Sequence, residues 1–180
     1  AGDYQRALTF YASALAIVQE LDLPEETGDV LLSIAEAQFA LGRIDLAHDR
    51  AGEALRLHRA GGFRYAEFGD LATLAELSQA AGRPDDAQRY LRSTTVLAGT
   101  LRTEMAAADV ALAEARVADR AGDWRRVLNV LEGARAPLAL TGNGASWEEH
   151  AMRARAYQRL NQLEAAIAAG RQALDVVERT

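Results

Sequence analysis

The sequence predicts an all-α fold made of repeated pairs of antiparallel helices. Gly2, Gly42, Gly82 and Gly122 lie forty residues apart, and Asn161 follows after thirty-nine. Small residues recur at fixed distances from these five positions, which we call the repeat markers. The alternation of apolar and polar residues that is typical of a β-strand occurs nowhere in the chain.

Small residues occupy matching columns of the repeat. Alanine stands seven residues before each of the last four markers and is the commonest residue five and twelve after a marker. Such residues let two helix backbones approach closely while larger neighbours fill the gaps. The columns hold Ala35, Ala75, Ala115 and Ala154 before the marker; Ala7, Ala47, Ala87, Val127 and Ala166 five after it; and Ala14, Ala54, Thr94, Ala134 and Ala173 twelve after it.

The marker positions divide the chain into a lone helix and four helix pairs. Glycine and asparagine most readily adopt the left-handed conformation that ends a helix, so each marker is expected to separate two helices. The expected helices cover residues 3–21, then 25–41 with 44–60, 65–81 with 84–98, 102–121 with 124–136, and 147–160 with 163–178.

Local signals support the boundaries in order along the chain. Asp3 and Asp123 are candidate N-caps, and Asp22-Leu23-Pro24-Glu25 has the pattern of a cap followed by a helix start. Gly61-Gly62 is typical of a helix stop, and Pro84 suits a first turn. Ser146 with Glu149 forms a capping-box pattern. The segment from Pro137 to Ala145 is the longest expected connection.

Composition excludes several classes of protein. The chain has no cysteine, so it has no disulfide framework, thiolate metal site or cysteine nucleophile. No apolar run approaches the ~20 residues that a membrane span needs, and a signal-peptide pattern is missing. The formal net charge of −6 argues against general binding to nucleic-acid phosphates.

The columns resemble those of the tetratricopeptide repeat (TPR) family. The stretch Gly42-Arg-Ile-Asp-Leu-Ala47, followed by Ala51, Ala54 and Leu55, is similar to the second half of such a repeat. The period here is about 40 residues instead of about 34, as in the long-repeat branches of the family. Three departures from the family pattern stand in the first helices of the last two pairs, at 102–121 and 147–160. Glu114 and Arg153 occupy an otherwise apolar column, and His150 takes a site that is often aromatic or leucine.

The resemblance implies a right-handed superhelix of stacked helix pairs across residues 1–180. A half repeat at 1–23 would precede repeats at about 24–62, 63–101, 102–141 and 142–180. The segment from Ala154 to Arg179 also resembles the last repeat before the peptidase domain of bacterial CHAT (caspase-like) proteins. Because the chain begins inside a repeat and ends without a polar capping helix, we expect it to be a fragment of a larger protein.

No residue pattern predicts an active site, a metal or a cofactor. His48 and His58 lie ten residues apart on one expected helix, ~15 Å along its axis, and no HExxH motif or cysteine pair supplies further ligands. Glu148 and Glu149 precede His150, but successive residues of a helix point in different directions. The glycine pairs lack the lysine of a phosphate loop. We therefore interpret the histidines as packing or surface residues and expect no catalysis.

The resemblance places the first helix of each pair along a concave groove, which is the candidate binding surface. The column six before the marker changes from Glu36 and Glu76 to Arg116 and Arg155. Such a gradient could orient an extended or helical partner with its anionic end toward the arginines, unless these pair with nearby acids such as Asp119. The full candidate set is Leu32, Glu36, Phe39, Glu76, Gln79, Leu112, Arg116, Arg120, Arg155, Gln158 and Arg159.

These observations favour a non-catalytic protein-interaction scaffold that is bacterial and cytoplasmic. The expected partner is a protein or peptide, with no nucleic acid, membrane or cofactor, and the chain is expected to be a monomer or a weak end-to-end dimer. Two alternatives stay open: the sensor arm of a CHAT peptidase, and the effector-binding arm of a bacterial transcription regulator. A distant His/Cys pair or a basic helix-turn-helix in flanking sequence would distinguish them.

Overall fold

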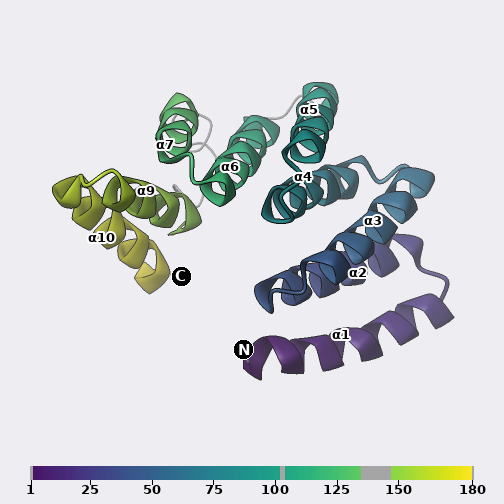
Figure 1. The fold of residues 1–180 in the computed structure, drawn as a ribbon. Coiled ribbons are helices and arrows are strands. Elements are labelled where there is room, and N and C mark those ends of the chain that lie inside the picture. Colours follow the sequence, from purple (N-terminus) through teal and green to yellow (C-terminus); the bar gives the residue numbers. More distant parts are fainter. Residues whose placement is uncertain (1, 102–103, 135–146, 180) are drawn as a thin grey trace. The chain divides into compact units, whose positions relative to one another are not determined.

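The computed structural model describes residues 2–101, 104–134 and 147–179, and these residues form nine helices and no strand (Figure 1). The predicted all-α class is therefore confirmed. The helix starts agree with the predicted ones to within two residues. Two ends differ by three residues: the helix expected at 84–98 ends at Leu101, and the helix expected at 124–136 ends at Gly133. The helices are α1 (Gly2–Glu20), α2 (Pro24–Ala40), α3 (Ile44–Gly61), α4 (Arg64–Ala80), α5 (Pro84–Leu101), α6 (Glu104–Ala121), α7 (Trp124–Gly133), α9 (Trp147–Arg159) and α10 (Leu163–Arg179).

The repeat markers end helices as their residue types predict. Gly42, Gly82 and Gly122 have φ of +75°, +72° and +72°, and Asn161 has φ of +61°. A side chain at such a φ is strained, which explains why glycine or asparagine stands at each break. Gly2 differs from the other markers, because it is the first residue of α1.

Two of the three predicted aspartate caps are wrong. Asp123 caps α7, since its Oδ1 accepts a hydrogen bond from the Arg126 backbone N–H at 3.1 Å. Asp3 instead lies inside α1, where its carboxylate pairs with Arg6. Asp22 has a left-handed backbone with φ of +52° and leaves the N-cap position of α2 to Leu23. Pro24 sets the start of that helix, because its fixed φ suits the first turn.

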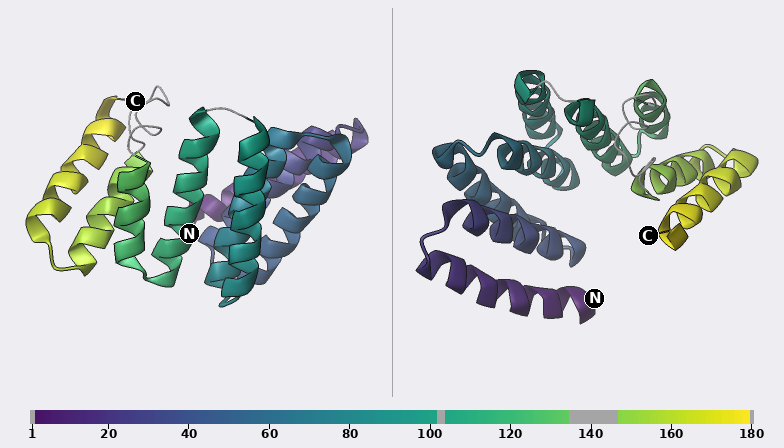
Figure 2. Two further views of the ribbon diagram at one scale, coloured as in Figure 1. Left: turned by 90° about the horizontal axis from the view of Figure 1, so that it is seen from above. Right: turned by 180° about the vertical axis from the view of Figure 1, so that it is seen from behind.

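Two compact units make up the chain, and the first covers Ala1–Leu97. In this unit α1 packs on α2, α2 on α3, and α4 on both α2 and α3, as the views in Figure 2 show. Ala35, Ala47, Ala51, Ala54 and Ala75 are all fully buried. At these five positions the alanines let the backbones of neighbouring helices pack closely, as the sequence predicted, whereas Ala7 and Ala14 of α1 are only half-buried.

The second unit covers Ala98–Thr180, where α6 packs on α7, α9 on both α6 and α7, and α10 on α9. Its core joins small residues of α6, the apolar side of α7, and Met152 with Ala156 of α9. Arg153, which departs from the apolar column, is 12% exposed and donates to the Leu131 carbonyl at 2.8 Å. It also pairs with Glu149 and Glu132, so it ties α9 to α7 by charge, where α2 and α4 have isoleucine and leucine in the same column.

Two expectations concern residues that the structure leaves undescribed. The connection from Pro137 to Ala145 lies outside the described residues, and so does Ser146 of the capping-box pattern. Glu149, the other half of that pattern, is buried and accepts from Arg153 Nε at 2.9 Å.

None of the helices in the described ranges has the length and apolar character to cross a membrane. The single solenoid across residues 1–180 and its repeat boundaries stay predictions.

Candidate interaction surfaces

In unit 1 the predicted groove residues lie on two helices that pack together. Leu32, Glu36 and Phe39 are on α2, and Glu76 and Gln79 are on α4. Glu36 is exposed, and the other four side chains are half-buried. The structure therefore brings these five residues onto neighbouring first helices, with a mixed apolar and acidic character.

In unit 2 the predicted arginines are held by partners on neighbouring helices. Arg116 of α6 donates from Nε and Nη2 to the two carboxylate oxygens of Glu148 on α9, at 2.7 and 2.6 Å. Arg155 of α9 pairs with Asp119 of α6. This second pairing is the one that the sequence offered as the alternative to free arginines.

The remaining predicted residues of unit 2 have different surroundings. The guanidinium of Arg159 lies 5.6 Å from the ring centroid of Trp124, a cation–π contact between α9 and α7. Arg120 and Gln158 are exposed. Leu112 packs against the core of the unit, so it contributes as much to stability as to any surface.

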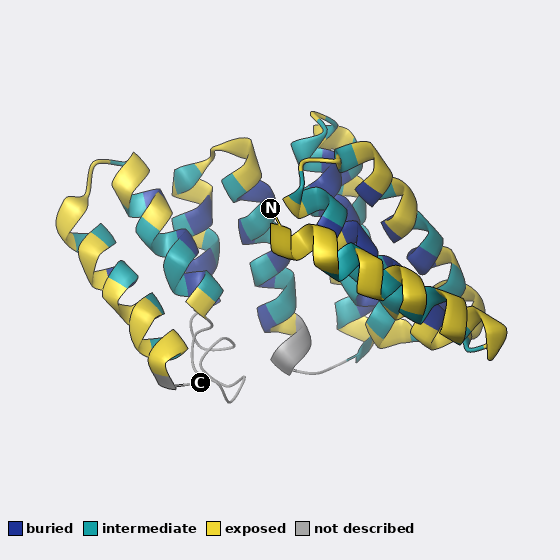
Figure 3. Ribbon diagram, turned by 90° about the horizontal axis from the view of Figure 1, so that it is seen from below, coloured by how far each residue is buried: buried dark blue, intermediate teal, exposed yellow. Residues whose placement is uncertain are grey.

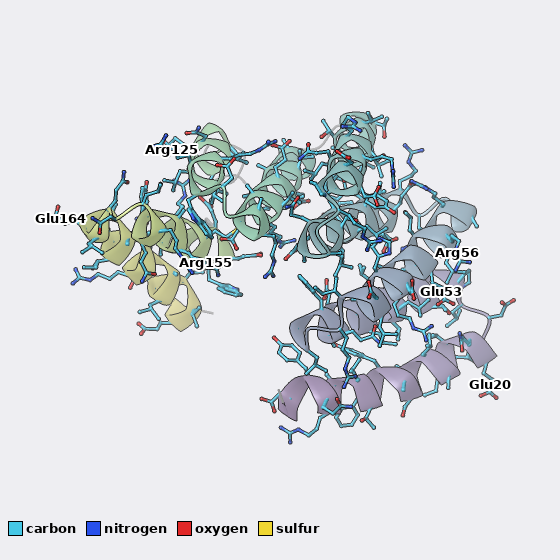
Figure 4. All side chains as sticks on the ribbon, viewed as in Figure 1. Glu20, Glu53, Arg56, Arg125, Arg155 and Glu164 are labelled. Atoms are coloured by element: carbon cyan, nitrogen blue, oxygen red, sulfur yellow. The ribbon has the colours of Figure 1, made fainter. Side chains whose placement is uncertain are left out.

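These contacts fix the arginines without hiding them. The side chain of Arg116 is 36% exposed and that of Arg155 is 49% exposed, and Figure 4 shows Arg155 projecting from α9. Bidentate pairing with a carboxylate restricts a guanidinium to one orientation. Among the predicted residues and the partners named above, the four arginines at positions 116, 120, 155 and 159 carry two more formal charges than the carboxylates of Asp119 and Glu148 neutralise.

A buried histidine–aspartate pair joins three helices of unit 1. His58 Nδ1 lies 2.6 Å from Asp70 Oδ2, and both side chains are fully buried. His58 Nε2 donates to the Glu25 carbonyl at 3.1 Å. One proton therefore lies between Nδ1 and Oδ2, and the pair as a unit is uncharged, which is how a low-dielectric site tolerates two titratable groups.

The surroundings of the pair shift both titrations. Burial by itself lowers the pKa of His58, but the hydrogen bond and charge of Asp70, with the Glu25 carbonyl, raise it above its ordinary value. Burial raises the pKa of Asp70 to about 6, against the lowering effect of His58. Two more acids face the pair: Asp29 Oδ1 lies 3.7 Å from Nε2, and Glu67 adds its charge.

Sequence reasoning missed this pair, although a signal was present. Asp70 stands twelve residues before its marker, in a column that otherwise holds Val30, Val110 and Glu149. A carboxylate in a partly apolar column points to a buried partner. The imidazole fits because residue 28 is glycine, where an added Cβ would lie 2.2 Å from His58 Nε2.

The other histidines have no chemistry of this kind. Burial, and then the charge of Arg83, lower the pKa of His48, and burial likewise lowers that of His150. Within the described ranges no three histidine or acidic side chains gather closely enough to hold a metal ion.

The last helix pair carries a hollow whose lining includes Arg155 and Gln158 of the predicted groove, beside apolar residues that the sequence did not single out. It lies between α9 and α10 and has a volume of about 570 Å³. Trp147 and Ala154 line it from α9, and Ile167, Leu174 and Val177 line it from α10. Leu174 and Val177 are 63% and 54% exposed, so the hollow opens to solvent.

No protein-family model matches the sequence, and none of the curated proteins matches it. Solved structures do match. BtubC (BKLC) from P. vanneervenii is 19% identical with a TM-score of 0.66, over 99% of this chain and 74% of that chain. A putative kinesin light chain from Podosopora anserina with nearly identical TPR-like repeats is 18% identical, with a TM-score of 0.57 over 99% and 89%. The chain has the fold of TPR-like repeat proteins.

A further match is a Rap protein solved in complex with Competence and Sporulation Factor. It is 16% identical with a TM-score of 0.71, and the match covers 98% of this chain. The chain spans 48% of the length of that Rap protein. The similarity to the repeats of CHAT proteins stays a prediction.

Proposed function

We propose that this chain is a non-catalytic scaffold that binds a protein or peptide through the exposed side of its first helices. The observation that carries the proposal is the arginine set of α6 and α9, which is fixed by Glu148, Asp119 and Trp124 and is still partly open to solvent. Fixed side chains lose little conformational entropy when a partner binds, so they raise affinity without any movement of the scaffold.

The charge of this face indicates the partner. The two excess positive charges favour a segment with acidic side chains, and the carboxylates of Glu148 and Asp119 make the attraction weaker than four free arginines would give. Since the similar Rap structure carries a bound factor, at least one protein with this fold holds a partner.

The test is a selection of random linear peptides on the immobilised 180-residue chain, followed by affinity measurements on the selected peptides. Acidic peptides should be enriched and should bind more weakly as salt concentration rises. Changing Arg116, Arg155 and Arg159 to glutamate should weaken binding at least ~10-fold, the loss expected when rim charges are reversed.

A matched control has the same change in net charge on second helices. It replaces Arg125, Arg126 and Arg171 of α7 and α10, all exposed, with glutamate. The control should keep the affinity of the wild type, and circular dichroism should show both variants folded. Equal losses in the two variants, or no peptide enriched over the bare support, would refute the proposed binding face.

Two further functions remain predictions from the sequence: the sensor arm of a CHAT peptidase and the effector-binding arm of a transcription regulator. Both use the same binding face, so the peptide selection does not separate them. The reading frame that flanks these residues does, through a caspase-like domain or a helix-turn-helix.

A further inference from the structure

A pocket of unit 1 concentrates positive charge. It lies between α3, α4 and α5 and has a volume of about 390 Å³, within the range of ~300–1,000 Å³ that is typical of small-molecule sites. Four arginines line it: Arg59 in the last turn of α3, Arg64 at the start of α4, and Arg89 and Arg92 on α5. The whole chain has a formal net charge of −6, so this concentration of arginines departs from its average character.

The helical repeat brings the lining residues onto one face of each helix. They stand at positions 64, 67 and 71 of α4 and at positions 89, 92, 93, 96 and 97 of α5. Residues three, four or seven apart lie on the same side of a helix. Leu91 and Thr94, on the opposite side of α5, are buried, and Figure 3 shows how buried and exposed residues alternate along the helices. The helix therefore packs through one side and presents its arginines on the other.

Acidic partners orient two of the four arginines. Arg59 Nε donates to Glu67 Oε1 at 2.7 Å, and Arg89 Nη1 pairs with Asp86 Oδ1 at 2.9 Å. The side chains of these two arginines remain 53% and 60% exposed. Arg92 is exposed and forms no ion pair or hydrogen bond with the part of the chain that the structure describes. The guanidinium groups can therefore still contact an anion in the pocket.

The pocket also has an apolar floor. Leu71 and Leu97 line it and are only 2% and 5% exposed, so they lie at its bottom, whereas Val96 is 72% exposed at its edge. A ligand that fills the pocket therefore meets hydrocarbon as well as guanidinium groups. An anion without an apolar part would leave the two leucines uncovered.

We propose that this pocket binds a small organic phosphate, that is, a phosphate monoester with an apolar or aromatic body. Such a phosphate carries a charge of about −1.5 to −2 at pH 7 and three acceptor oxygens, so it accepts hydrogen bonds from several guanidinium groups at once. A carboxylate has one charge and two oxygens and complements fewer of them. The site goes beyond the proposed function, because none of the candidate groove residues lines it.

Phenyl phosphate is the probe, and two related anions test its parts. Phenyl sulfate has a similar shape but a single charge, and inorganic phosphate lacks the apolar body. Phenyl phosphate should bind the intact chain at least ~10-fold more tightly than phenyl sulfate, because its hydrogen bonds carry more charge. It should bind at least ~5-fold more tightly than inorganic phosphate, because it also covers the leucines. NMR titration of the arginine Nε–H signals at constant ionic strength measures these affinities.

Arginine variants locate the probe. Arg89→Gln with Arg92→Gln should weaken binding of phenyl phosphate at least ~10-fold, because it removes two guanidinium groups from the pocket. Arg50→Gln with Arg56→Gln is the matched control on α3, where Figure 4 labels Arg56, since neither residue lines the pocket. Each double variant includes one arginine that pairs with an acid three residues away at 2.9 Å. The control should keep the affinity of the wild type, and circular dichroism should show both variants folded.

Val96→Ser tests the apolar contact separately. Val96 is exposed at the edge of the pocket, so the change leaves the core intact. It should weaken binding of phenyl phosphate ~2-fold or more and leave the affinity for inorganic phosphate unchanged. An equal effect on the two anions would contradict the apolar part of the proposal.

A phosphorylated side chain of a partner protein offers the same chemistry as a free organic phosphate. A library of phosphotyrosine peptides separates the two sources. Peptides that bind no more tightly than phenyl phosphate support a small molecule. Peptides that bind at least ~10-fold more tightly would assign the pocket to a partner protein and overturn the inference.

Three further results would overturn it. The first is no binding of phenyl phosphate up to about 1 mM, the weakest affinity of interest. The second is equal affinity for phenyl phosphate and phenyl sulfate, and the third is an equal loss of affinity in the two double arginine variants. None of these results depends on the arginine face of unit 2, because every residue changed belongs to unit 1.

Discussion

Breaking the His58–Asp70 pair tests how unit 1 holds its helices in register. His58→Val leaves the buried Asp70 carboxyl without its imidazole partner, and Asp70→Val leaves the buried Nδ1 of His58 without its carboxylate, while Nε2 keeps the Glu25 carbonyl. Removing one member of a buried pair typically costs about 3–5 kcal/mol of unfolding free energy. For a chain of this size each kcal/mol lowers Tm by roughly 2–4 °C, so each single variant should melt roughly 6–20 °C below the wild type.

The double variant His58→Val with Asp70→Val separates the free energy of the interaction between the two residues from the effect of each residue on its other neighbours. Valine already occupies both columns elsewhere, as Val18 and Val177 in one and Val30 and Val110 in the other. Two valines replace the pair at similar volume with no buried charge, so the double variant should lie within about 1 kcal/mol of the wild type. The coupling free energy from the cycle should then be several kcal/mol.

The assay is urea unfolding followed by far-UV circular dichroism. Tryptophan fluorescence would miss the event, because both tryptophans, Trp124 and Trp147, lie in unit 2. Single variants that each lose less than about 1 kcal/mol, or a double variant that loses the sum of the two single losses, would refute the reasoning.

Three other predictions concern the titration of the same pair, two glycines of α2 and α3, and the N-cap of α7. Because the pKa of His58 is raised in the folded state, its contribution to the free energy of unfolding is complete below pH 6.5 and is lost as pH rises through the folded pKa. Because the pKa of Asp70 is raised from 3.8 to about 6, the free energy of unfolding also falls as pH rises through that range. Both groups therefore make the wild type more stable at lower pH, so its Tm minus that of the double valine variant should be more positive at about pH 5 than at about pH 8.5. A Tm difference that does not change with pH would contradict this. Gly28→Ala should destabilise the fold because the new Cβ meets the His58 ring. Gly52→Ala has open space around it and should stabilise α3 by about 0.5–1 kcal/mol. The Tm values of the two variants should therefore move in opposite directions from that of the wild type. Asp123→Ala should cost about 1 kcal/mol through loss of the α7 N-cap, measured by urea unfolding, while Asp123→Asn should keep most of the stability.

The sequence predicted the helices well because their ends depend on local chemistry. A residue such as Gly82 or Asn161 determines a helix stop within a few residues, whatever the rest of the chain does. The caps were harder, since Asp3 and Asp22 have the right residue type but the wrong backbone position. An N-cap must lie directly before the first helical residue, and the left-handed backbone of Asp22 makes Leu23 the N-cap of α2 instead.

The surfaces could be predicted only in part, because side-chain pairing depends on which helices meet. The columns identified Arg116 and Arg155 as residues of one face, but not that Glu148 holds the first of them. The His58–Asp70 pair joins residues from different helices, so the column of Asp70 indicates a buried carboxylate but does not identify His58 as its partner. The α9–α10 hollow could not be predicted from the columns, because Leu174 occupies the column of the buried Leu55 and is nevertheless 63% exposed.

The most direct test of the proposed binding face is NMR of the arginine Nε–H groups in the intact chain with a selected acidic peptide. The account predicts that the signals of Arg116, Arg155 and Arg159 shift as the peptide is added, while that of Arg125, exposed on α7 (Figure 4), stays in place. Shifts at Arg125 with none at the other three would contradict it, because binding would then use the second helices.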